Sequence, residues 1–124
     1  MQMVSEAKSQ IENLDNDQLA AEIESGALIV DIREQNEREQ LGVIPGAMHV
    51  PRGLLEFWAE PESPMHRDEF QLDRRIVLHC ATGGRSALAA VALKELGYSN
   101  VAHHEPGFNA WEADGRPVEE IEPV

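Results

Sequence analysis

Two short runs of apolar residues that do not alternate with polar ones occur along the chain, over residues 76–78 and over residues 27–30, the latter in a predicted strand over 27–31 that ends in Asp31. Both are rich in branched side chains and are too short for a helix. Uninterrupted apolar runs of this length are typical of strands buried on both faces of a parallel sheet. We therefore predict two central strands, with shorter strands over residues 11–14 and 47–50 and within 98–104.

Apolar residues at helical spacing separate these strands. They form one face of a predicted helix over residues 17–24, which Asp15 or Asn16 caps at its start. Residues 86–96 are dominated by helix formers, and Gly97 stands where a left-handed helix end is expected. This second helix follows directly on the strand over 76–78.

Shorter helices are expected in three further places. Residues 3–11 can form one short helix, and residues 37–41 one or two turns. Residues 51–74 contain three prolines and a charged stretch, so only short helices are expected there. Within that segment we expect Leu54 and Phe57 to pack in the core.

The alternation of strands and helices predicts an α/β fold, a mainly parallel sheet covered by helices on both faces. A length of 124 residues fits one domain with one core. We assign residues 1–10 to an N-terminal extension that can be helical, and residues 11–124 to a single domain.

Charge excludes some classes of partner. The formal net charge is -13 and the isoelectric point is near 4.6, whereas nucleic acids and anionic membranes require a basic surface. No apolar stretch is long enough to span a bilayer, and residues 1–13 lack the apolar centre of a signal peptide. We therefore expect a cytoplasmic protein without nucleic-acid or membrane partners.

Cys80, the single cysteine, lies between the strand over 76–78 and the following helix. There the N–H groups of the loop and the positive end of the helix should converge on its sulfur. Gly83 and Gly84 permit a positive φ, and Arg85 adds a planar donor fork suited to an oxyanion. These features should lower the pKa of Cys80 from about 8.5 into the range of roughly 3.5 to 7.5, giving a nucleophile at neutral pH.

The alternative is that Cys80 is a buried, inert thiol. The loop of two glycines and an arginine favours the reactive interpretation, because a core cysteine does not need it. His79, one residue earlier on the strand, should point to the opposite face and act as a structural, hydrogen-bonded histidine. His66, in a polar setting, is expected to be exposed.

Two kinds of chemistry use a cysteine loop before a helix that carries arginine. Cysteine phosphatases place five residues between the two, whereas here only residues 81–84 separate Cys80 from Arg85. The loop resembles the smaller active-site loop of the rhodanese sulfurtransferases, which holds a persulfide sulfur. Asp31-Ile-Arg33 with the downstream acid Glu37, and the turn Ile44-Pro-Gly-Ala47, resemble motifs of the same family.

The resemblance implies a rhodanese-like open sheet of five strands and a thiosulfate sulfurtransferase of the double-displacement type. Sulfane sulfur from thiosulfate or a related donor would pass through a Cys80 persulfide to cyanide, a thiol or a protein cysteine. Cys80 is the implied catalytic residue, and Arg85 would hold the sulfonate of the donor. The implied substrate-binding residues are Ala81, Thr82, Gly83, Gly84, Arg85 and Ser86.

Three positions depart from the usual pattern of the family. Ala81 stands where many members have a basic residue, which predicts only modest activity with doubly charged thiosulfate. Val43 replaces a histidine, and Pro106 replaces the first glycine before the final helix. Two alternatives remain: a persulfide carrier or protein-binding module with little activity of its own, and, less favoured, a cysteine phosphatase or arsenate reductase.

Asp31, Arg33 and Trp58 are supporting candidates. A carboxylate near the loop would oppose anion binding unless it were paired, so we favour structural roles for Asp31 and Arg33. Trp58 could form an aromatic rim beside Cys80. His103 and His104 are adjacent on a strand and face opposite ways, so we expect no zinc site and no cofactor.

Overall fold

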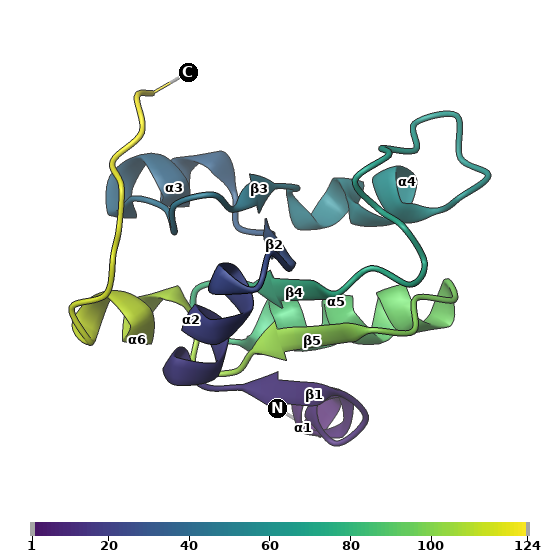
Figure 1. Cartoon of the computed structure of the whole chain (residues 1–124), viewed down its shortest axis with the longest axis horizontal. Coiled ribbons are helices and arrows are strands. Elements are labelled where there is room, and N and C mark those ends of the chain that lie inside the picture. Colours follow the sequence, from purple (N-terminus) through teal and green to yellow (C-terminus); the bar gives the residue numbers. More distant parts are fainter. Residues whose placement is uncertain (1, 124) are drawn as a thin grey trace.

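The centre of the structure is a parallel sheet of five strands in the order β1-β5-β4-β2-β3, found in a computed structural model that describes residues 2–123 (Figure 1). This confirms the expected sheet. The strands are β1 (Glu12–Leu14), β2 (Leu28–Asp31), β3 (Met48–His49), β4 (Ile76–His79) and β5 (Val101–His104).

Helices cover both faces of the sheet, as predicted. They are α1 (Gln2–Lys8), α2 (Asn16–Glu24), α3 (Gln35–Leu41), the short 3-10 helix η1 (Arg52–Leu54), α4 (Leu55–Ala59), α5 (Gly84–Glu95) and α6 (Phe108–Ala113). Alternate strand residues pack toward opposite layers, with α4 and α5 on one face and α2 and α6 on the other. Helix α1 packs against α5.

The ends of the two main helices follow from their sequence. Asp15 caps α2, and its side chain accepts from the N–H of Gln18 at 2.8 Å. Gly97 ends α5 with φ +105°, where a residue with a Cβ would be strained. The N–H of Gly97 donates to the carbonyl of Lys94 and that of Tyr98 to the carbonyl of Leu93, which is a Schellman motif.

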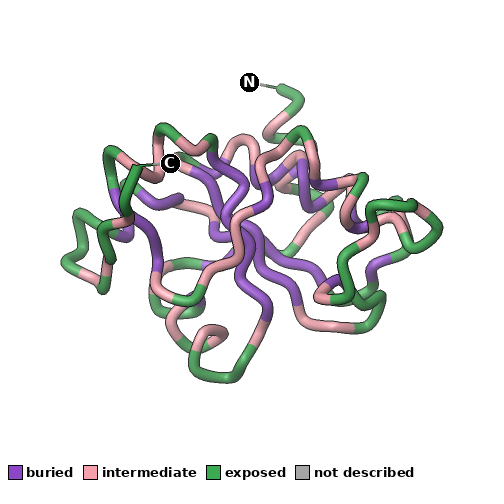
Figure 2. Tube along the Cα trace, turned by 90° about the horizontal axis from the view of Figure 1, so that it is seen from above, coloured by how far each residue is buried: buried purple, intermediate pink, exposed green. Residues whose placement is uncertain are grey.

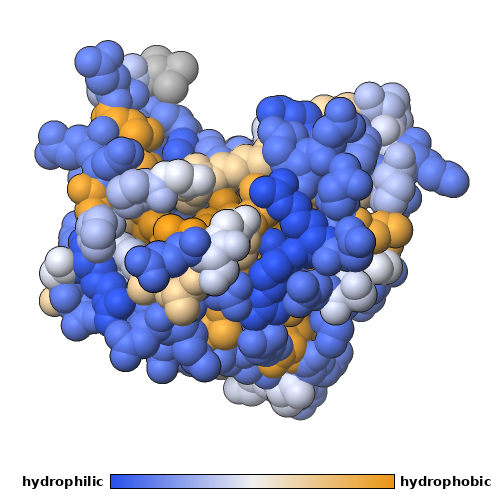
Figure 3. Space-filling model, in the orientation of Figure 1, coloured by the Kyte–Doolittle hydropathy of each residue, from blue (hydrophilic) through white to orange (hydrophobic). Residues whose placement is uncertain are grey.

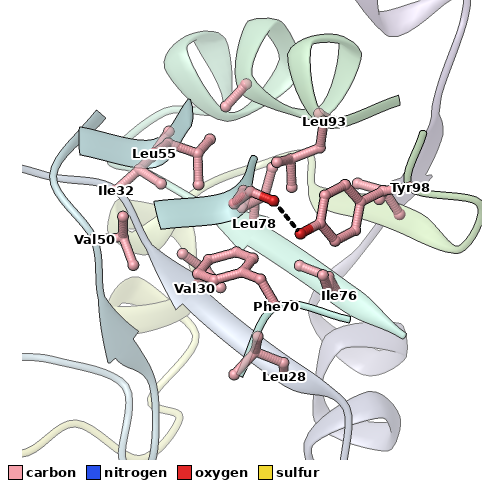
Figure 4. Close-up of a cluster of buried hydrophobic side chains, with 14 of the residues drawn as sticks. Leu28, Val30, Ile32, Val50, Leu55, Phe70, Ile76, Leu78, Leu93 and Tyr98 are labelled. Atoms are coloured by element: carbon pink, nitrogen blue, oxygen red, sulfur yellow. Dashed lines mark hydrogen bonds between the residues drawn. The ribbon is translucent and has the colours of Figure 1, made fainter. Parts of the chain in front are cut away.

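Branched side chains from β2 and β4 fill the core between the sheet and α5 (Figure 4). The Tyr98 hydroxyl, which is buried here, donates to the carbonyl of Ala59, so its polar atom is satisfied. Buried backbone is concentrated in the central strands, whereas the outer loops are exposed (Figure 2). The strands that position the candidate site are therefore held by packing on both sides.

The segment over residues 51–74 departs from expectation at two residues. Phe57 is 55% exposed rather than buried, because Leu55 and Ala59, four residues apart, are the buried residues of the short helix α4 and Phe57 points away from their side of the helix. Leu54 packs against the core, although it is only partly buried. His66 is half-buried rather than exposed, and its Nε2 lies 3.1 Å from the carbonyl oxygen of Phe70.

The face of the molecule seen in Figure 3 is mainly hydrophilic, and hydrophobic residues appear on it in patches. Large exposed apolar side chains are spread over several elements: Met3, Leu41, Phe57, Met65 and Leu72. Single exposed apolar residues of this kind are normal on soluble domains. Among the residues described, no helix has the length and apolar character required to cross a bilayer.

Candidate functional site

The carboxyl ends of β2 and β4 lie side by side, with Asp31 in register with His79. Cys80 follows His79 directly, so Asp31 and Cys80 lie at the same edge of the sheet, as predicted. In open α/β sheets this edge is where ligands bind. The alternation of side chains sends Asp31 and His79 to one face and Cys80 to the other.

The loop after β4 directs hydrogen-bond donors at the sulfur of Cys80. The N–H of Gly83 lies 3.2 Å from Sγ and the N–H of Ser86 lies 3.4 Å from it. Both glycines permit a positive φ, but only Gly83 adopts one, at +88°, whereas Gly84 begins α5. One left-handed glycine is enough because the helix starts immediately afterwards.

The loop is anchored to the start of α6. The N–H of Phe108 donates to the carbonyl of Cys80 at 2.8 Å, and the N–H of Asn109 to that of Ala81 at 3.1 Å. A Cβ on Gly107 would collide with the Ala81 carbonyl, and one on Gly83 would collide with the backbone of residue 105. The glycine retained after Pro106 therefore preserves the close approach of these two loops.

The hydrogen bonds that reach Sγ lower the pKa of Cys80. Burial is the largest influence and opposes ionisation, because the residue is only 1% exposed. The hydrogen bond with the side chain of Ser86, and those from the N–H groups of Ser86, Thr82 and Gly83, outweigh it. Ala81 is half-buried and Thr82 is exposed, so the outer side of the loop reaches solvent.

Arg85 is paired, which the sequence did not indicate. Its Nη1 and Nη2 donate to the two carboxylate oxygens of Glu37 at 2.8 and 2.7 Å. The same bonds raise the pKa of Arg85 and lower that of Glu37. The charge expected to attract an oxyanion is therefore partly neutralised by the downstream acid of the Asp-x-Arg motif.

Asp31, Arg33 and Arg38 form a buried group that we call the ion-pair cluster. The Nε of Arg33 donates to Oδ1 of Asp31 at 3.0 Å, and its Nη2 donates to Oδ2 at 2.8 Å. The Nε of Arg38 also donates to Oδ2, at 3.2 Å. Burial would raise the pKa of Asp31, but the bonds from Arg33 bring it down to about 2. Asp31 is therefore a paired carboxylate, and the structural roles favoured for Asp31 and Arg33 stay a prediction.

His79 lies beside this cluster, with its Nε2 4.0 Å from Oδ2 of Asp31. Within residues 2–123, no group lies at hydrogen-bonding geometry to either ring nitrogen, so the expected hydrogen-bonded histidine is not found, although the nearby backbone of Cys80 raises its pKa. The ring instead stacks on Phe108, 6.5 Å between centroids. Burial lowers the pKa of His79 to about 4, so the ring is neutral at pH 7 and needs no ionic partner.

A second polar group, which we call the cysteine cluster, comprises Cys80, Ser86, His103 and Asn13. Sγ of Cys80 lies 3.6 Å from Oγ of Ser86, which is 2.9 Å from Nδ1 of His103. Nε2 of His103 lies 2.7 Å from Oδ1 of Asn13. His103 lies two residues after Val101 on β5, so alternation along the strand could have predicted that both face α5. The sequence could not have predicted that His103 lies beside Ser86, because it does not give the order of the strands.

The remaining candidates lie elsewhere. Trp58 packs at the edge of the core, and the guanidinium of Arg67 lies 4.6 Å from its ring centroid. Its place at a pocket rim stays a prediction. His104 turns away from His103, with Nε2 2.6 Å from Oδ1 of Asn16. No group of three or more potential metal ligands occurs in the part of the chain that the structure describes.

Comparison with known proteins identifies the relatives of this chain. The family model described as Rhodanese-like domain matches residues 15–114. A sulfurtransferase of Allochromatium vinosum is 35% identical over 73% of this chain and 77% of its own length. A thiosulfate sulfurtransferase of Pseudomonas fluorescens is 33% identical, over 71% and 72% of the two chains.

Two further similarities broaden the range of described roles. A putative sulfur carrier protein of Bacillus subtilis is 34% identical over 67% of this chain and 40% of its own. A solved structure from Rhodopseudomonas palustris, of unknown function and described as a possible tyrosine phosphatase, superposes with a TM-score of 0.89. It is 46% identical and covers 94% of this chain and 91% of its own.

Proposed function

The chain belongs to the rhodanese-like family, and we propose that it transfers sulfane sulfur from thiosulfate or a related donor to a thiophilic acceptor through a Cys80 persulfide. The observation that carries this proposal is the pair of N–H groups, from Gly83 and Ser86, directed at Sγ of Cys80. These donors favour the thiolate, the form of cysteine that attacks sulfur.

The reaction has two displacements. In the first, the Cys80 thiolate attacks the outer sulfur of thiosulfate, a sulfur–sulfur bond forms, and sulfite leaves with the electron pair of the broken bond. The outer sulfur of the Cys80 persulfide then carries the negative charge. In the second, the acceptor attacks that outer sulfur and Cys80 departs as the thiolate.

The loop residues have separate proposed roles. The N–H groups over residues 81–85 surround the transferred sulfur, and the hydroxyls of Thr82 and Ser86 can add donors. Arg85 keeps further N–H groups beyond those used by Glu37 and can direct them to the sulfonate. Because Ala81 adds no charge and Arg85 is paired, we propose weak binding of thiosulfate.

The acceptor must come from outside the chain. Cys80 is the single cysteine, so no second thiol can resolve the persulfide as an internal disulfide. Cyanide suffices for an assay, whereas a cellular thiol or a protein cysteine is the acceptor we propose for the cell. No metal or cofactor takes part in either displacement as written.

A persulfide carrier is the second candidate, and the putative sulfur carrier among the relatives favours it. A carrier accepts sulfur once and releases it only to its partner protein, so it shows no turnover with small acceptors. A phosphatase is the third candidate because of the Rhodopseudomonas description. The loop of four residues between Cys80 and Arg85 argues against it.

Thiocyanate formation from thiosulfate and cyanide tests the proposal. We expect saturable turnover by the wild type and none by Cys80→Ser, with matching circular dichroism spectra. Full turnover by the serine variant would contradict the covalent route. A Cys80 persulfide that forms once but yields no thiocyanate with cyanide would indicate a carrier, and aryl phosphate hydrolysis that depends on Cys80 would indicate a phosphatase.

A further inference from the structure

The hydroxyl of Ser86 lies between two acceptors and has one hydrogen to give. Its Oγ is 2.9 Å from Nδ1 of His103 and 3.6 Å from Sγ of Cys80. All three side chains are buried, so no water competes for this hydrogen within the cysteine cluster. The state of Cys80 is therefore linked to the direction in which the Ser86 hydroxyl points.

Asn13 fixes which nitrogen of His103 carries the proton. Its Nδ2 donates to the carbonyls of Lys8 at 2.9 Å and Ile11 at 3.0 Å, so its Oδ1 must face His103. Oδ1 accepts from Nε2 at 2.7 Å, which places the proton on Nε2. Burial lowers the pKa of His103 to about 4, so at pH 7 its Nδ1 can only accept.

We propose that His103 is a positioning residue that holds the Ser86 hydroxyl away from the Cys80 thiolate and thereby favours the states in which Sγ is uncharged. Those states are the thiol and the persulfide.

The hydrogen-bond count in each state gives the reason. In the thiol, S–H of Cys80 donates to Ser86 and the Ser86 hydroxyl donates to Nδ1 of His103, so every group has a partner. In the thiolate, the hydroxyl either turns to Sγ and leaves buried Nδ1 unpaired, or stays on Nδ1 and leaves the thiolate without that donor. His103 therefore opposes part of the stabilisation that the loop N–H groups provide.

Other charged groups near the cluster are accounted for. Lys8 and Glu105, which pair with each other at 2.9 Å, act on His103 in opposite directions, Lys8 lowering its pKa and Glu105 raising it. Arg85, in the first turn of α5, lies near Cys80 and is paired with Glu37. His79 is on the opposite face of the sheet. None of these groups supplies a hydrogen-bond acceptor that would replace His103 beside Ser86.

In the persulfide the charge is on the outer sulfur, and the Ser86 hydroxyl can return to His103. Resting on the proposed function, this implies that His103 slows the discharge of sulfur. When cyanide attacks the outer sulfur, thiocyanate forms and the sulfur–sulfur bond breaks. The electron pair of that bond stays on Sγ, which becomes the thiolate that His103 disfavours.

Thiolate absorbance at 240 nm, titrated against pH, measures the inference without any sulfur transfer. Cys80 is the single cysteine, and burial raises the pKa of the single tyrosine, Tyr98, to about 12, so the two signals separate. We expect His103→Leu to move the midpoint to lower pH. Below the midpoint the thiolate fraction should rise about two- to tenfold, the equilibrium effect of one hydrogen bond.

Matched variants separate this effect from a general loss of packing. His104→Leu removes a buried histidine with an asparagine partner from the other face and should leave the midpoint unchanged. In a Ser86→Ala background, His103→Leu should also have no effect, because the hydroxyl is gone. His103→Asn retains an acceptor near Nδ1 and should restore the wild-type midpoint.

Asn13→Leu provides a second route should His103→Leu not fold, since Asn13 is exposed. Loss of its Oδ1 frees His103 to protonate at Nδ1 and donate to Ser86, so the midpoint should again fall. A midpoint that rises in either variant would overturn the proposal and make His103 a support for the thiolate. An equal shift in His104→Leu, or one that persists without the Ser86 hydroxyl, would overturn it as well.

The consequence for sulfur is read separately, on persulfide-loaded protein. Thiocyanate release after a pulse of cyanide should be about two- to tenfold faster in His103→Leu than in the wild type. Were no persulfide to form in either protein, the proposed function would fail while the titration result stood. A loaded variant that discharged at the wild-type rate would contradict only the link to sulfur retention.

Discussion

The two faces of the sheet, compared at its carboxyl edge, carry polar clusters of opposite character. On the α6 face, the ion-pair cluster satisfies Asp31 with two arginines, and the charge is neutralised where it is buried. On the α5 face, the N–H groups of Gly83 and Ser86 point at Sγ in the cysteine cluster, and the cation near Sγ, Arg85, is already paired with Glu37. The difference between them is whether the buried anion already has a cation as partner.

This comparison shows how one strand end can serve structure and chemistry together. His79 and Cys80 are neighbours in the sequence, yet alternation along β4 separates them into the two clusters. The ion-pair cluster holds the ends of the strands in position and does not neutralise the sulfur of Cys80, which lies on the other face. On the α5 face, N–H groups point at Sγ, and the charge of the nearby Arg85 is partly neutralised by Glu37. This is the face on which we propose that the sulfur chemistry takes place.

The largest expected effect is the loss of sulfur transfer in Cys80→Ser, with little loss of stability. Serine keeps a small side chain that the same N–H groups can contact, so we expect the free energy of unfolding to change by only about 1 kcal/mol. Urea denaturation beside the thiocyanate assay checks both parts. A variant with lost activity and a severely reduced stability would mean that Cys80 is chiefly structural.

The ion-pair cluster should show the reverse behaviour. Arg33→Met leaves Asp31 buried with only Arg38 as a charged donor, which should cost about 3 to 5 kcal/mol of stability. Arg38→Met, at the more exposed edge of the cluster, should cost less. The activity of Arg33→Met is measured at a low temperature at which the variant is folded. If it then transferred no sulfur at all, the claim that the ion-pair cluster serves stability and not sulfur transfer would be wrong.

Acid should act on both faces, at two different stages. The folded pKa values of His79, His103 and His104 are about 4, 4 and 3, below the ordinary value of 6.5, because all three rings are buried. The unfolded chain then binds more protons, so stability is complete above pH 6.5 and falls as the pH drops toward 4. At pH 5 we expect a loss of roughly 1 to 2 kcal/mol for each histidine.

Asp31 sharpens this expectation. Its folded pKa is about 2, so its contribution is present above pH 3.8 and is lost only as the pH falls toward 2. Denaturation curves from pH 7 to pH 3 should therefore show the histidine effect first. Stability that stayed constant between pH 6.5 and pH 4 would show that these rings are not held neutral.

The smallest expected effect concerns the pair between Arg85 and Glu37. Glu37→Gln removes the charge that competes for the guanidinium, so the KM for thiosulfate should fall by up to about fivefold, as the energy of a partly exposed ion pair allows. Glu34→Gln changes the net charge equally and is the control. Arg85→Ala should raise KM, and an unchanged KM would remove Arg85 from donor binding.

Much of the fold followed from local sequence patterns. The apolar runs of β2 and β4 and the left-handed Gly97 depend on neighbouring residues and were predicted, and the cap at Asp15 was one of the two positions expected. Phe57 was misplaced because a helix of five residues offers too little periodicity to identify its buried face. Short elements depend on tertiary packing, which the local pattern does not contain.

The candidate site divides in the same way. The loop around Cys80 is local, so its donors and its position before α5 could be predicted. The pairing of Arg85 with Glu37 and the contact of His103 with Ser86 join residues 48 and 17 positions apart, so they depend on the order of the strands. Family resemblance indicated the residues of the motif, but not which charges neutralise one another.

Intact-protein mass spectrometry after brief exposure to thiosulfate tests the central claim most directly. We predict that the wild type gains the mass of one sulfur atom, that cyanide removes it, and that Cys80→Ser never gains it. A wild-type protein whose mass stays unchanged at saturating thiosulfate and other sulfane donors, while Cys80 is reduced, would contradict the account.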